Sequence, residues 1–596
     1  MPCAALPANT GGQAVDKGDF FERNLRALSE RNPPLCSRLA AASTGNRYQF
    51  QKSRSGELIP AFVDDAGCAH PLHSTIDPKK EAQRLISSLQ EGGGEGAGEA
   101  AGGESTGVFA IFLGLGAGFV QEAALNSGFA CGVLVIEFDI GGVAALMRSL
   151  DYSALLADPR FTLLVDPAPD IIERTIFDLY YPALFGGITM LPLRSRTGFD
   201  KEQFGAASGT VQHTIEKVSQ DYSVQAHFGM RWFANIIRNL AAVHNQAHSA
   251  SPAGDAAICA AGPSLDMQLP LLAQRRRELF VIAADTALPA LLQYGLTPDA
   301  VVSIDCQHIS YYHFAGIDCR DIPLFLDIAS PPMLSHFSAF PFFFSGGHPL
   351  AAYISQEWRP LPMLDTSGGN VTYACLSLAE SLGARRITVY GADFSYPQDK
   401  VYARGTYIHP FFERRQERRR PLEALLSAFL YRSPFLPPQT QEAAACRETE
   451  SLRFYRKRFE QKASAMSAEV IAAKGLGVPL EINRKNNRAG GGYSGGAFTA
   501  GKASKSAAEF LEQYRRDIDN LPVPGGTKSA AAYLRELDEN GRRIFATLLP
   551  QAAAIRHRRP ELDAGGLIDG VKRYCIGGIE KVLNCTTTHY PHNTVC

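Results

Sequence analysis

Short apolar runs alternate with helical stretches through the middle of the chain. Five runs at residues 256–262, 278–285, 299–305, 322–328 and 385–393 have the length and composition of buried strands: AAICAAG, ELFVIAAD, DAVVSID, IPLFLDI and RRITVYGAD. Between them, residues 265–274, 286–294 and 370–382 place apolar positions at helical spacing. Such alternation is typical of a mainly parallel sheet with helices on both faces. We therefore predict a central Rossmann-like α/β domain.

A smaller α/β domain is predicted before it. The segment GVFAIFLGLGAGFVQEAAL has the pattern of a strand, a glycine turn and a helix, and GVLVIEFD that of a second strand ending in acid. Gly114, Gly116 and Gly118 would let a nucleotide or S-adenosylmethionine approach the backbone, with Glu137 or Asp139 on its ribose. A glycine turn is also needed merely to pack a helix onto a strand. We favour this second interpretation, because no catalytic residue type follows nearby.

The rest of the pattern is helical or of low complexity. Helical spacing is found at residues 20–39, 223–242, 422–430, 443–475 and beyond 507, whereas residues 91–106 and 486–502 are rich in glycine with glutamate or serine. The low-complexity stretches bury too little surface to offset their ordering entropy, so we expect flexible segments there. We predict four regions: 1–106, ending in a Gly/Glu-rich linker; a Rossmann-like domain at 107–222; the central domain at 223–420; and an all-helical region at 421–596, with a flexible loop at 486–502.

Composition narrows the classes of function. The 596 residues include 59 Lys and Arg against 60 Asp and Glu, so no overall field would hold nucleic acid or an anionic membrane. The longest apolar run, residues 107–120, is too short for a membrane span, and no leader pattern opens the chain. We expect a cytoplasmic protein. The 12 cysteines include no Cys-x-x-Cys pair, which predicts reduced thiols and no structural zinc.

Polar residues follow the predicted strands of the central domain. Gly262, Pro263 and Ser264 stand where the first strand gives way to a helix, and a helix amino terminus offers amides to phosphate. An ordinary strand-to-helix turn with Ser264 as cap explains the same residues. The next two strands end in Asp285 and Asp305. Asp285 also fits a helix cap, whereas Asp305 is followed by two histidines and two tyrosines in one loop: His308, Tyr311, Tyr312 and His313.

The segment from residue 365 to 402 is the most specific part of the chain. Thr366, Ser367 and Gly368 open a helix that Asn370 starts, which predicts a second amide-rich anion pocket. The following strand ends in Asp393. Two tyrosines, Tyr396 and Tyr402, come next in a loop.

Together these elements resemble known glycosyltransferases. Gly-Pro-Ser after a first strand, Thr-Ser-Gly opening a helix and Gly-x-Asp-Phe ending the next strand are similar to bacterial sialyltransferases that use CMP-activated sugars. SIDCQH, with Trp232 and Asn235 before it, resembles still more the motility accessory factors, a family associated with transfer of pseudaminic or legionaminic acid to flagellin. The resemblance covers residues 225–412 well and the flanks weakly.

The resemblance implies roles for individual residues. Gly262, Pro263 and Ser264 would contact the nucleotide, with Asp285 and Asp393 beside it. Its ribose and phosphate would lie against a second group: Thr366, Ser367, Gly368 and Asn370. Tyr396 and Tyr402 would steady the leaving phosphate, although Ser395 occupies the place where the family has the first tyrosine. Ala261 stands where the sialyltransferases have asparagine.

Transfer from a CMP-sugar needs a base for the acceptor hydroxyl. His409, in the loop TYIHPFF, is the predicted base, with His308 and His313 in reserve beside Asp305. The basic run at residues 413–420 would attract an acidic donor or acceptor, but the solvated face of a helix is the favoured interpretation.

The predicted function is therefore transfer, with inversion, of a nonulosonic acid from a CMP-sugar to serine or threonine of flagellin, which would support flagellum assembly and motility. The donor is a substrate, no tightly bound cofactor or metal is expected, and self-association is left open. A second hypothesis is an MptE-like pyrophosphokinase, since that fold family shares the Gly-x-Pro-Ser and Ala-Asp elements. Its magnesium site would call for grouped carboxylates, whereas Cys306 and Gln307 follow Asp305. A third is a noncatalytic flagellin-binding accessory protein.

Overall fold

The computed structural model describes residues 17–43, 47–64, 66–91, 107–245, 249–250, 253–437, 446–483, 498–525 and 530–587. Most of the linker predicted at 91–106 and of the loop predicted at 486–502 lies outside these residues. The chain divides into two compact units. Unit 1 comprises Met1–His227, Pro522–Arg542 and Leu549–Val571, and unit 2 comprises Phe228–Leu521, Arg543–Leu548 and Lys572–Cys596. The division into four regions stays a prediction.

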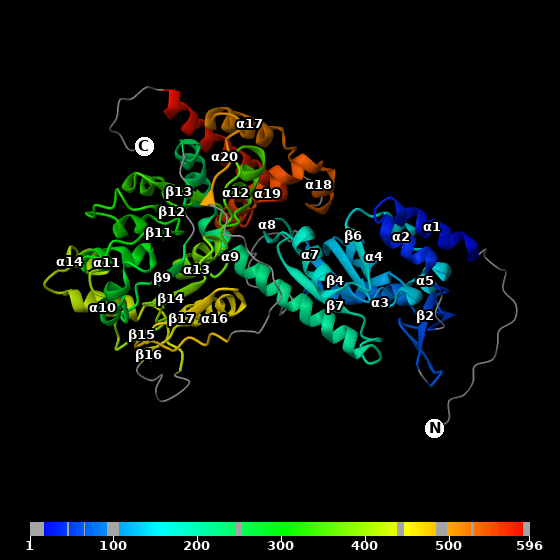
Figure 1. Ribbon diagram of the computed structural model, residues 1–596. Helices are drawn as coiled ribbons and strands as arrows, with labels where there is room; N and C mark the ends of the chain where they lie inside the picture. Colours follow the sequence, from blue (N-terminus) through cyan, green and yellow to red (C-terminus); the bar gives the residue numbers. More distant parts are fainter. Residues whose placement is uncertain are drawn as a thin grey trace. The chain divides into compact units, whose positions relative to one another are not determined.

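Unit 1 contains the predicted smaller α/β domain (Figure 1). Its parallel sheet has the order β6-β5-β4-β7, and β4 and β5 are apolar almost throughout because helices cover both faces. The strands are β4 (Val108–Leu113), β5 (Ala130–Glu137), β6 (Phe161–Val165) and β7 (Ile188–Pro192), and the helices between them α4 (Phe119–Asn126), α5 (Ile140–Ser149), α6 (Ser153–Ala157), α7 (Pro169–Leu179) and α8 (Pro182–Phe185). An antiparallel sheet and α3 (Pro78–Glu91) precede it, the sheet being built from β1 (Tyr48–Lys52), β2 (Leu58–Val63) and β3 (Ala69–Pro71).

The amphipathic segment predicted at 20–39 is two helices, α1 (Lys17–Ser29) and α2 (Pro33–Ala41). Pro33 and Pro34 carry no backbone N–H, so they suit the first turn of a new helix and not the interior of a continuing one. Asn32 caps α2 by accepting a hydrogen bond from the Leu35 amide at 3.1 Å.

The glycine turn of unit 1 is filled by the protein's own side chains. Gly114, Gly116 and Gly118 all have positive φ, as the tight turn requires. The Leu115 amide donates to Glu137 at 2.6 Å, and Glu137 also accepts from the buried Arg196 at 2.8 and 2.9 Å. The Ala117 amide donates to Nε2 of buried His73 at 2.8 Å. These contacts support the interpretation as a packing turn.

Unit 2 is built on a seven-stranded parallel sheet in the order β13-β12-β11-β10-β9-β14-β17, which confirms the predicted central α/β fold. The strands are β9 (Asp255–Cys259), β10 (Phe280–Ala284), β11 (Ala300–Ser303), β12 (Leu324–Asp327), β13 (Pro341–Phe344), β14 (Arg386–Tyr390) and β17 (Glu469–Ala472). The chain runs outward from β9 to β13 and then returns to β14 on the other side of β9. The strand order therefore reverses between β9 and β14, where open α/β sheets usually bind ligands.

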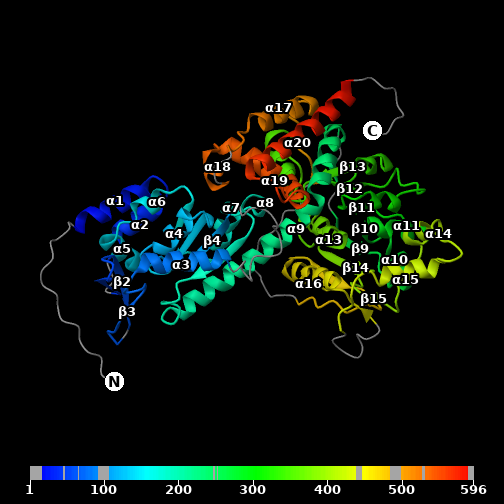
Figure 2. The same ribbon diagram turned by 180° about the vertical axis from the view of Figure 1, so that it is seen from behind.

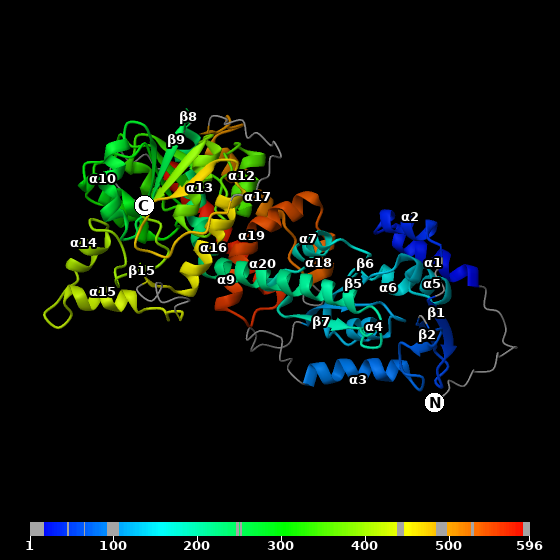
Figure 3. The same ribbon diagram turned by 60° about the horizontal axis from the view of Figure 1, so that its bottom comes forward.

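Helices flank this sheet, and Figure 3 shows α10 and α13 on opposite sides of the strands. They are α10 (Leu265–Arg275), α11 (Leu288–Gln293), α12 (Pro349–Glu357) and α13 (Val371–Ser381), joined by the short 3-10 helices η1 (Asp285–Ala287), η2 (His308–His313) and η3 (Pro332–Phe337). The part of the long helix α9 (Lys201–Asn245) from Phe228 onward also belongs to this unit. Its predicted range, 223–242, lies within the observed helix.

The sequence missed two strands. β13 has the short run PFFF, and β17 lies inside the stretch 443–475 that was predicted to be helical. That stretch holds the paired strand β16 (Cys446–Arg447), α16 (Glu450–Ala465) and then β17, which takes the open edge of β14. An edge strand is decided by the strand that it pairs with, and a four-residue run carries little periodicity of its own.

The basic run at 413–420 is not a helix face, so that interpretation was wrong. Helix α14 (Ile408–Glu413) ends as the run begins, and Glu417 and Arg420 exchange backbone hydrogen bonds across a tight turn before α15 (Leu422–Leu430). The side chains of the run are exposed.

Helices dominate the carboxy-terminal part, as predicted (Figure 2). They are α17 (Ala507–Asn520), α18 (Ala530–Glu536), α19 (Glu539–Arg558) and α20 (Ala564–Thr587). Residues at the end of the predicted loop form β18 (Phe498–Thr499), which pairs with β8 (Ser249–Ala250). None of the helices within the described ranges is both long and apolar enough to cross a bilayer.

Candidate functional site

Four strand ends of unit 2 bring predicted site residues to one edge of the sheet. Ser264 follows β9, Asp285 follows β10, Asp305 follows β11 and Asp393 follows β14. These strands are parallel neighbours in the sheet, so their carboxyl ends share one edge. We call this the carboxyl edge.

Ser264 and Asp393 bind each other. The Ser264 amide donates to Asp393 Oδ2 at 2.8 Å, and the Ser264 hydroxyl donates to Oδ1. Both residues are buried, and the chain after β17 closes over them. The Leu476 amide donates to Ser264 Oγ at 2.6 Å and the Gly477 amide to Asp393 Oδ1 at 3.0 Å. The polar atoms that were predicted to face a nucleotide therefore have partners within the protein.

The glycine before Ser264 is needed for the same junction. A Cβ on Gly262 would lie 2.4 Å from both the Asp393 carboxylate and the Gly391 carbonyl oxygen. Burial raises the pKa of Asp393, while its hydrogen bonds to Ser264 and Gly477 oppose the increase. Pro263, also predicted to touch the nucleotide, lies in the turn between Gly262 and Ser264. Ser264 precedes α10, but its side chain makes no cap hydrogen bond to that helix.

The carboxylate of Asp285 is surrounded by donors. Oδ1 accepts from the Thr286 amide at 2.6 Å and its hydroxyl at 3.0 Å, and Oδ2 accepts from Ser303 Oγ at 2.7 Å. His313 Nδ1 lies 3.2 Å from Oδ2. Burial alone would raise the pKa of Asp285, but the His313 imidazole and these hydroxyls together hold it below its usual value.

Asp305 lies on the next strand end with a carboxylate that is only partly used. It accepts from the Gln307 amide at 2.9 Å. Burial, and the negative charge of Asp285, raise its pKa. Burial and the charge of Asp305 also raise the pKa of Tyr455, a residue of α16 whose ring lies against Gly369. No sequence pattern pointed to Tyr455, because α16 is distant along the chain.

The turn at residues 366–368, before α13, is stabilised by hydrogen bonds and by side-chain packing. Thr366 Oγ1 donates to the Gly346 carbonyl at 3.1 Å, and the Ser367 amide donates to Asp365 Oδ1 at 3.0 Å. A Cβ on Gly368 would lie 2.1 Å from the Tyr373 ring, so glycine is required for packing.

Asn370 is the amino cap of α13. Its Oδ1 accepts from the Tyr373 amide at 3.0 Å, and its Nδ2 donates to the Gly368 carbonyl at 3.0 Å. This side chain was predicted to bind ribose or phosphate, but both its amide oxygen and its amide nitrogen form hydrogen bonds within the turn.

Asp327 was missed by the sequence analysis. It ends β12, is buried, and accepts from the Ala329 amide at 2.8 Å. Burial raises its pKa to about 6. A Cβ on Gly346 would lie 2.2 Å from its Oδ2, so Asp327 lies close to the Thr366 turn. The run IPLFLDI carries the same acid-after-strand signal as Asp285 and Asp305.

The predicted tyrosines lie within electrostatic reach of each other, whereas the predicted base forms no hydrogen bond or ring contact with either in the described chain. Tyr402 lies 6.2 Å, ring to ring, from Tyr407, whose ring lies 4.6 Å from that of His313. Burial raises the pKa of Tyr402. Tyr396 lies in β15 (Tyr396–Pro397), with its ring 6.2 Å from Phe435. His409, on α14, is half-buried and makes no hydrogen bond, ion pair or ring contact with the rest of the described chain.

Helix α9 fixes the loops behind the edge. Asn235 Nδ2 donates to the carbonyls of Cys306 at 3.0 Å and Ala329 at 2.8 Å. One turn later, Asn239 Nδ2 donates to those of Ile328 at 2.8 Å and Ser330 at 2.9 Å. Two asparagines thereby set the course of the loops after β11 and β12.

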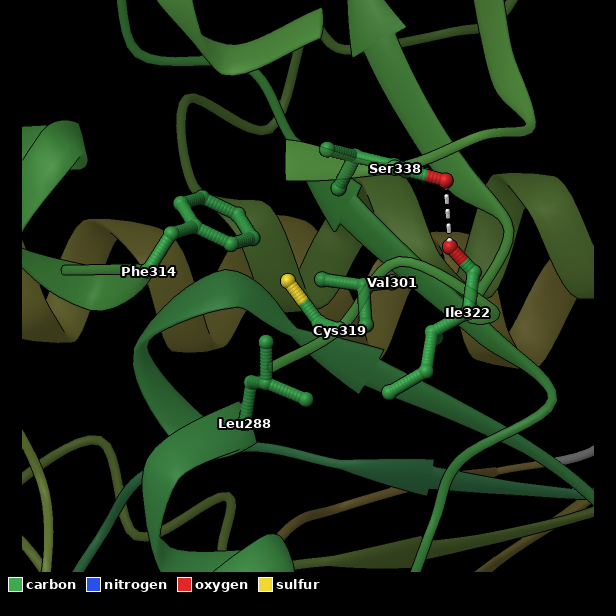
Figure 4. A pocket seen from close by; sticks show the side chains of 7 residues that line it. Leu288, Val301, Phe314, Cys319, Ile322 and Ser338 are labelled. Atoms are coloured by element: carbon green, nitrogen blue, oxygen red, sulfur yellow. Dashed lines mark hydrogen bonds between the residues drawn. The ribbon is translucent and has the colours of Figure 1, made fainter. Parts of the chain in front are cut away.

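Two hollows lie outside this edge. One is an apolar gap with no room for a water molecule, lined by residues that include Phe314 and Cys319 (Figure 4). Beside it, the Ser338 hydroxyl donates to the Ile322 carbonyl at 2.6 Å. The other, of about 400 Å³, lies between α16 and residues near Glu481. Within the ranges that the structure covers, no three His, Cys, Asp or Glu side chains are grouped to hold a metal.

Comparisons with known proteins agree with this geometry. Residues 231–399 match the family described as 6-hydroxymethylpterin diphosphokinase MptE-like, so the chain contains an MptE-like domain. The MAf glycosyltransferase from Magnetospirillum magneticum AMB-1 has the same fold, with a TM-score of 0.57 and 12% identity over 95% of each chain. Both confirm the predicted resemblance.

Sequence relatives come from Treponema pallidum (strain Nichols) and are described as uncharacterized proteins. One is 41% identical over 119 residues, which are 20% of this chain and 42% of the relative. Another is 27% identical over 165 residues, 27% of this chain and 79% of the relative. The chain thus spans less than half of the length of the first of these relatives.

Proposed function

We propose that this chain is a glycosyltransferase that moves a nonulosonic acid from a CMP-activated donor to serine or threonine hydroxyls of flagellin. The observation that carries the proposal is the fold shared with the MAf glycosyltransferase over 95% of both chains. The flagellin acceptor, the CMP donor and inversion at the sugar follow from the resemblance of the central domain and belong to the proposal.

The polar groups of the carboxyl edge support a transfer reaction. Transfer from a nucleotide sugar needs donors for the departing phosphate and a base for the acceptor hydroxyl. Tyr402 and Tyr407 are hydroxyl donors near His313, and the turn from Thr366 to Gly368 lies before the amino terminus of α13. We place the donor between these two groups.

The proposed contacts to the nucleotide differ from those that the sequence predicted. Ser264 and Asp393 form hydrogen bonds with each other and with the chain after β17. They would therefore support the backbone beneath a nucleotide and would not contact it directly. Direct contacts would fall to Thr366, Ser367 and the backbone around Gly262.

The match to the MptE-like family favours a second candidate, a pyrophosphokinase. Such an enzyme needs acids free to bind magnesium beside a triphosphate. Both oxygens of Asp285 are engaged by Thr286, Ser303 and His313. With Asp285 engaged, Asp305 and Asp327 are left as the acids with partly used carboxylates, and the smaller set of available acids favours the transferase over the kinase.

Calorimetry separates the candidates. The transferase predicts CMP binding that does not require magnesium, whereas the kinase predicts magnesium-dependent ATP binding. A protein that binds flagellin and neither nucleotide would be an accessory factor. Intact-mass analysis of flagellin from cells lacking the gene tests the acceptor: the mass should fall by whole sugar residues, and an unchanged mass would refute flagellin as acceptor.

A further inference from the structure

A buried aspartate and a histidine form a pair at the carboxyl edge. Short helix η2 turns the chain after β11 back toward the end of β10 and brings His313 to Asp285. His313 is 6% exposed and Asp285 is 1% exposed. Nδ1 of the imidazole lies 3.2 Å from Asp285 Oδ2 without the alignment of a hydrogen bond, and no described group forms a hydrogen bond with that nitrogen.

The surroundings of Asp285 favour one orientation and one tautomer of this imidazole. Ser303 donates to Oδ2 at 2.7 Å, and Thr286 donates twice to Oδ1, so the carboxylate cannot turn away. The negative charge of a carboxylate 3.2 Å from Nδ1 favours the neutral tautomer that carries its proton on Nδ1, with Nε2 as the acceptor. The Tyr407 ring, 4.6 Å away, packs against the imidazole.

The other histidines nearby lack such a partner. His308 is exposed and stacks 5.5 Å from the Tyr311 ring. His409 has no carboxylate within hydrogen-bond reach in the described chain. His313 thus combines a fixed orientation, a carboxylate and a place among the strand ends where the donor is expected.

We propose that Nε2 of His313 is the general base of the transfer reaction and that Asp285 is its positioning residue. This inference rests on the proposed glycosyl transfer. Nε2 takes the proton of the acceptor hydroxyl while the hydroxyl oxygen forms a bond to the anomeric carbon. The bond from that carbon to the phosphate oxygen breaks, and the nucleotide leaves with the electron pair. The imidazolium formed is stabilised by the Asp285 carboxylate.

Three groups lie close to the His313 imidazole and will influence the pH dependence of transfer. Asp285 faces Nδ1 from η1, and Asp305 interacts electrostatically with His313 from the loop after β11. The ring of Tyr407 lies against the imidazole from the segment before α14. Tyr402 interacts electrostatically with both Asp285 and Tyr407, and Arg432 interacts with Tyr407.

The first test compares steady-state transfer by the full chain and its variants. His313→Asn should lower kcat about 10² to 10⁴-fold with CMP affinity unchanged, as expected for loss of a placed base. His336→Asn, an exposed histidine on η3, is the matched control and should retain wild-type rates. His409→Asn is the rival: if it abolishes transfer while His313→Asn stays within about threefold of wild type, the inference is overturned.

The second test addresses Asp285. In Asp285→Asn the acid limb of the kcat/KM profile should move to lower pH by about one unit, because the imidazolium loses its carboxylate. A merely structural aspartate would lower the melting temperature and leave that limb in place.

A third readout does not depend on activity. Nitrogen NMR of the histidine-labelled protein, with His313→Asn to assign the signal, should show the proton on Nδ1 in the wild type and its loss in Asp285→Asn. A proton found on Nε2 would refute the base assignment even if transfer were confirmed. Wild-type protein that shows the Nδ1 tautomer yet transfers no sugar would refute the proposed function instead.

Discussion

At the scale of single residues, buried side chains in this protein are mostly committed to backbone groups or to one another. Glu137, Ser264 and Asp393 each form several hydrogen bonds inside the protein. An unpaired buried polar group costs about 1 to 3 kcal/mol, so a substitution at such a residue should lower the free energy of unfolding. The Asp285 and His313 pair differs, because the buried Nδ1 of the imidazole lies beside the carboxylate yet forms no hydrogen bond in the described chain.

His73 gives unit 1 an acid sensitivity. Burial lowers its pKa to about 4, and its Nε2 must stay unprotonated to accept the Ala117 amide. The unfolded chain binds a proton near pH 6.5, so stability present above that pH is lost as the pH falls toward 4. At pH 5 the loss from this residue is about 2 kcal/mol relative to pH 7.5.

Thermal unfolding of wild type and His73→Gln at pH 7.5 and pH 5 measures this effect. Glutamine can accept the same amide without titrating, so the variant should lose less stability than wild type on acidification. His213→Gln, an exposed position on α9, serves as the control and should behave as wild type. Equal acid losses in wild type and His73→Gln would contradict the assignment.

At the scale of elements, helix α9 and strand β17 position the site, although neither belongs to the alternating strands and helices predicted for the central sheet. The chain after β17 donates hydrogen bonds to Ser264 and Asp393. The asparagines of α9 donate hydrogen bonds to the loops after β11 and β12. The carboxyl edge therefore depends on residues far away in the sequence.

Asn239→Ala tests the contribution of α9. Removing the amide leaves the Ile328 and Ser330 carbonyls without a donor in a buried place, which should lower the unfolding free energy by about 2 to 4 kcal/mol. Arg238→Ala, exposed on the neighbouring position, should change it by less than about 0.5 kcal/mol. Denaturant unfolding provides both values, and equal effects of the two substitutions would show that the carbonyls find other partners.

At the scale of the whole molecule, the last helices serve both units. Helix α19 passes from unit 1 into unit 2 and back, and α20 passes from unit 1 into unit 2. In unit 1 Arg535 donates to the carbonyls of Asp158 and Phe161, and in unit 2 the Tyr514 and Thr547 hydroxyls are 2.6 Å apart.

A chain ending at residue 521 should therefore weaken both units at once. Hydrogen exchange should rise at β6 and at α17, whose partners are removed, and stay low at β10 and β11 in the middle of the large sheet. Exchange measured by mass spectrometry on the full and shortened chains checks this. Protection lost in only one of the two elements would mean that the helices stabilise a single unit.

Local pattern was enough to predict the parallel sheets, most of their helices and the acids at the strand ends. The runs from AAICAAG to RRITVYGAD predict strands because burial on both faces requires continuous apolar residues. The acids that follow them were predicted to meet because parallel strands end at one edge of the sheet. Only the tertiary structure decided how these acids are used. Asp393 is tied to Ser264, Asp285 to His313, and β17 joins the sheet, because pairing across the fold depends on distances between residues that the linear pattern does not contain.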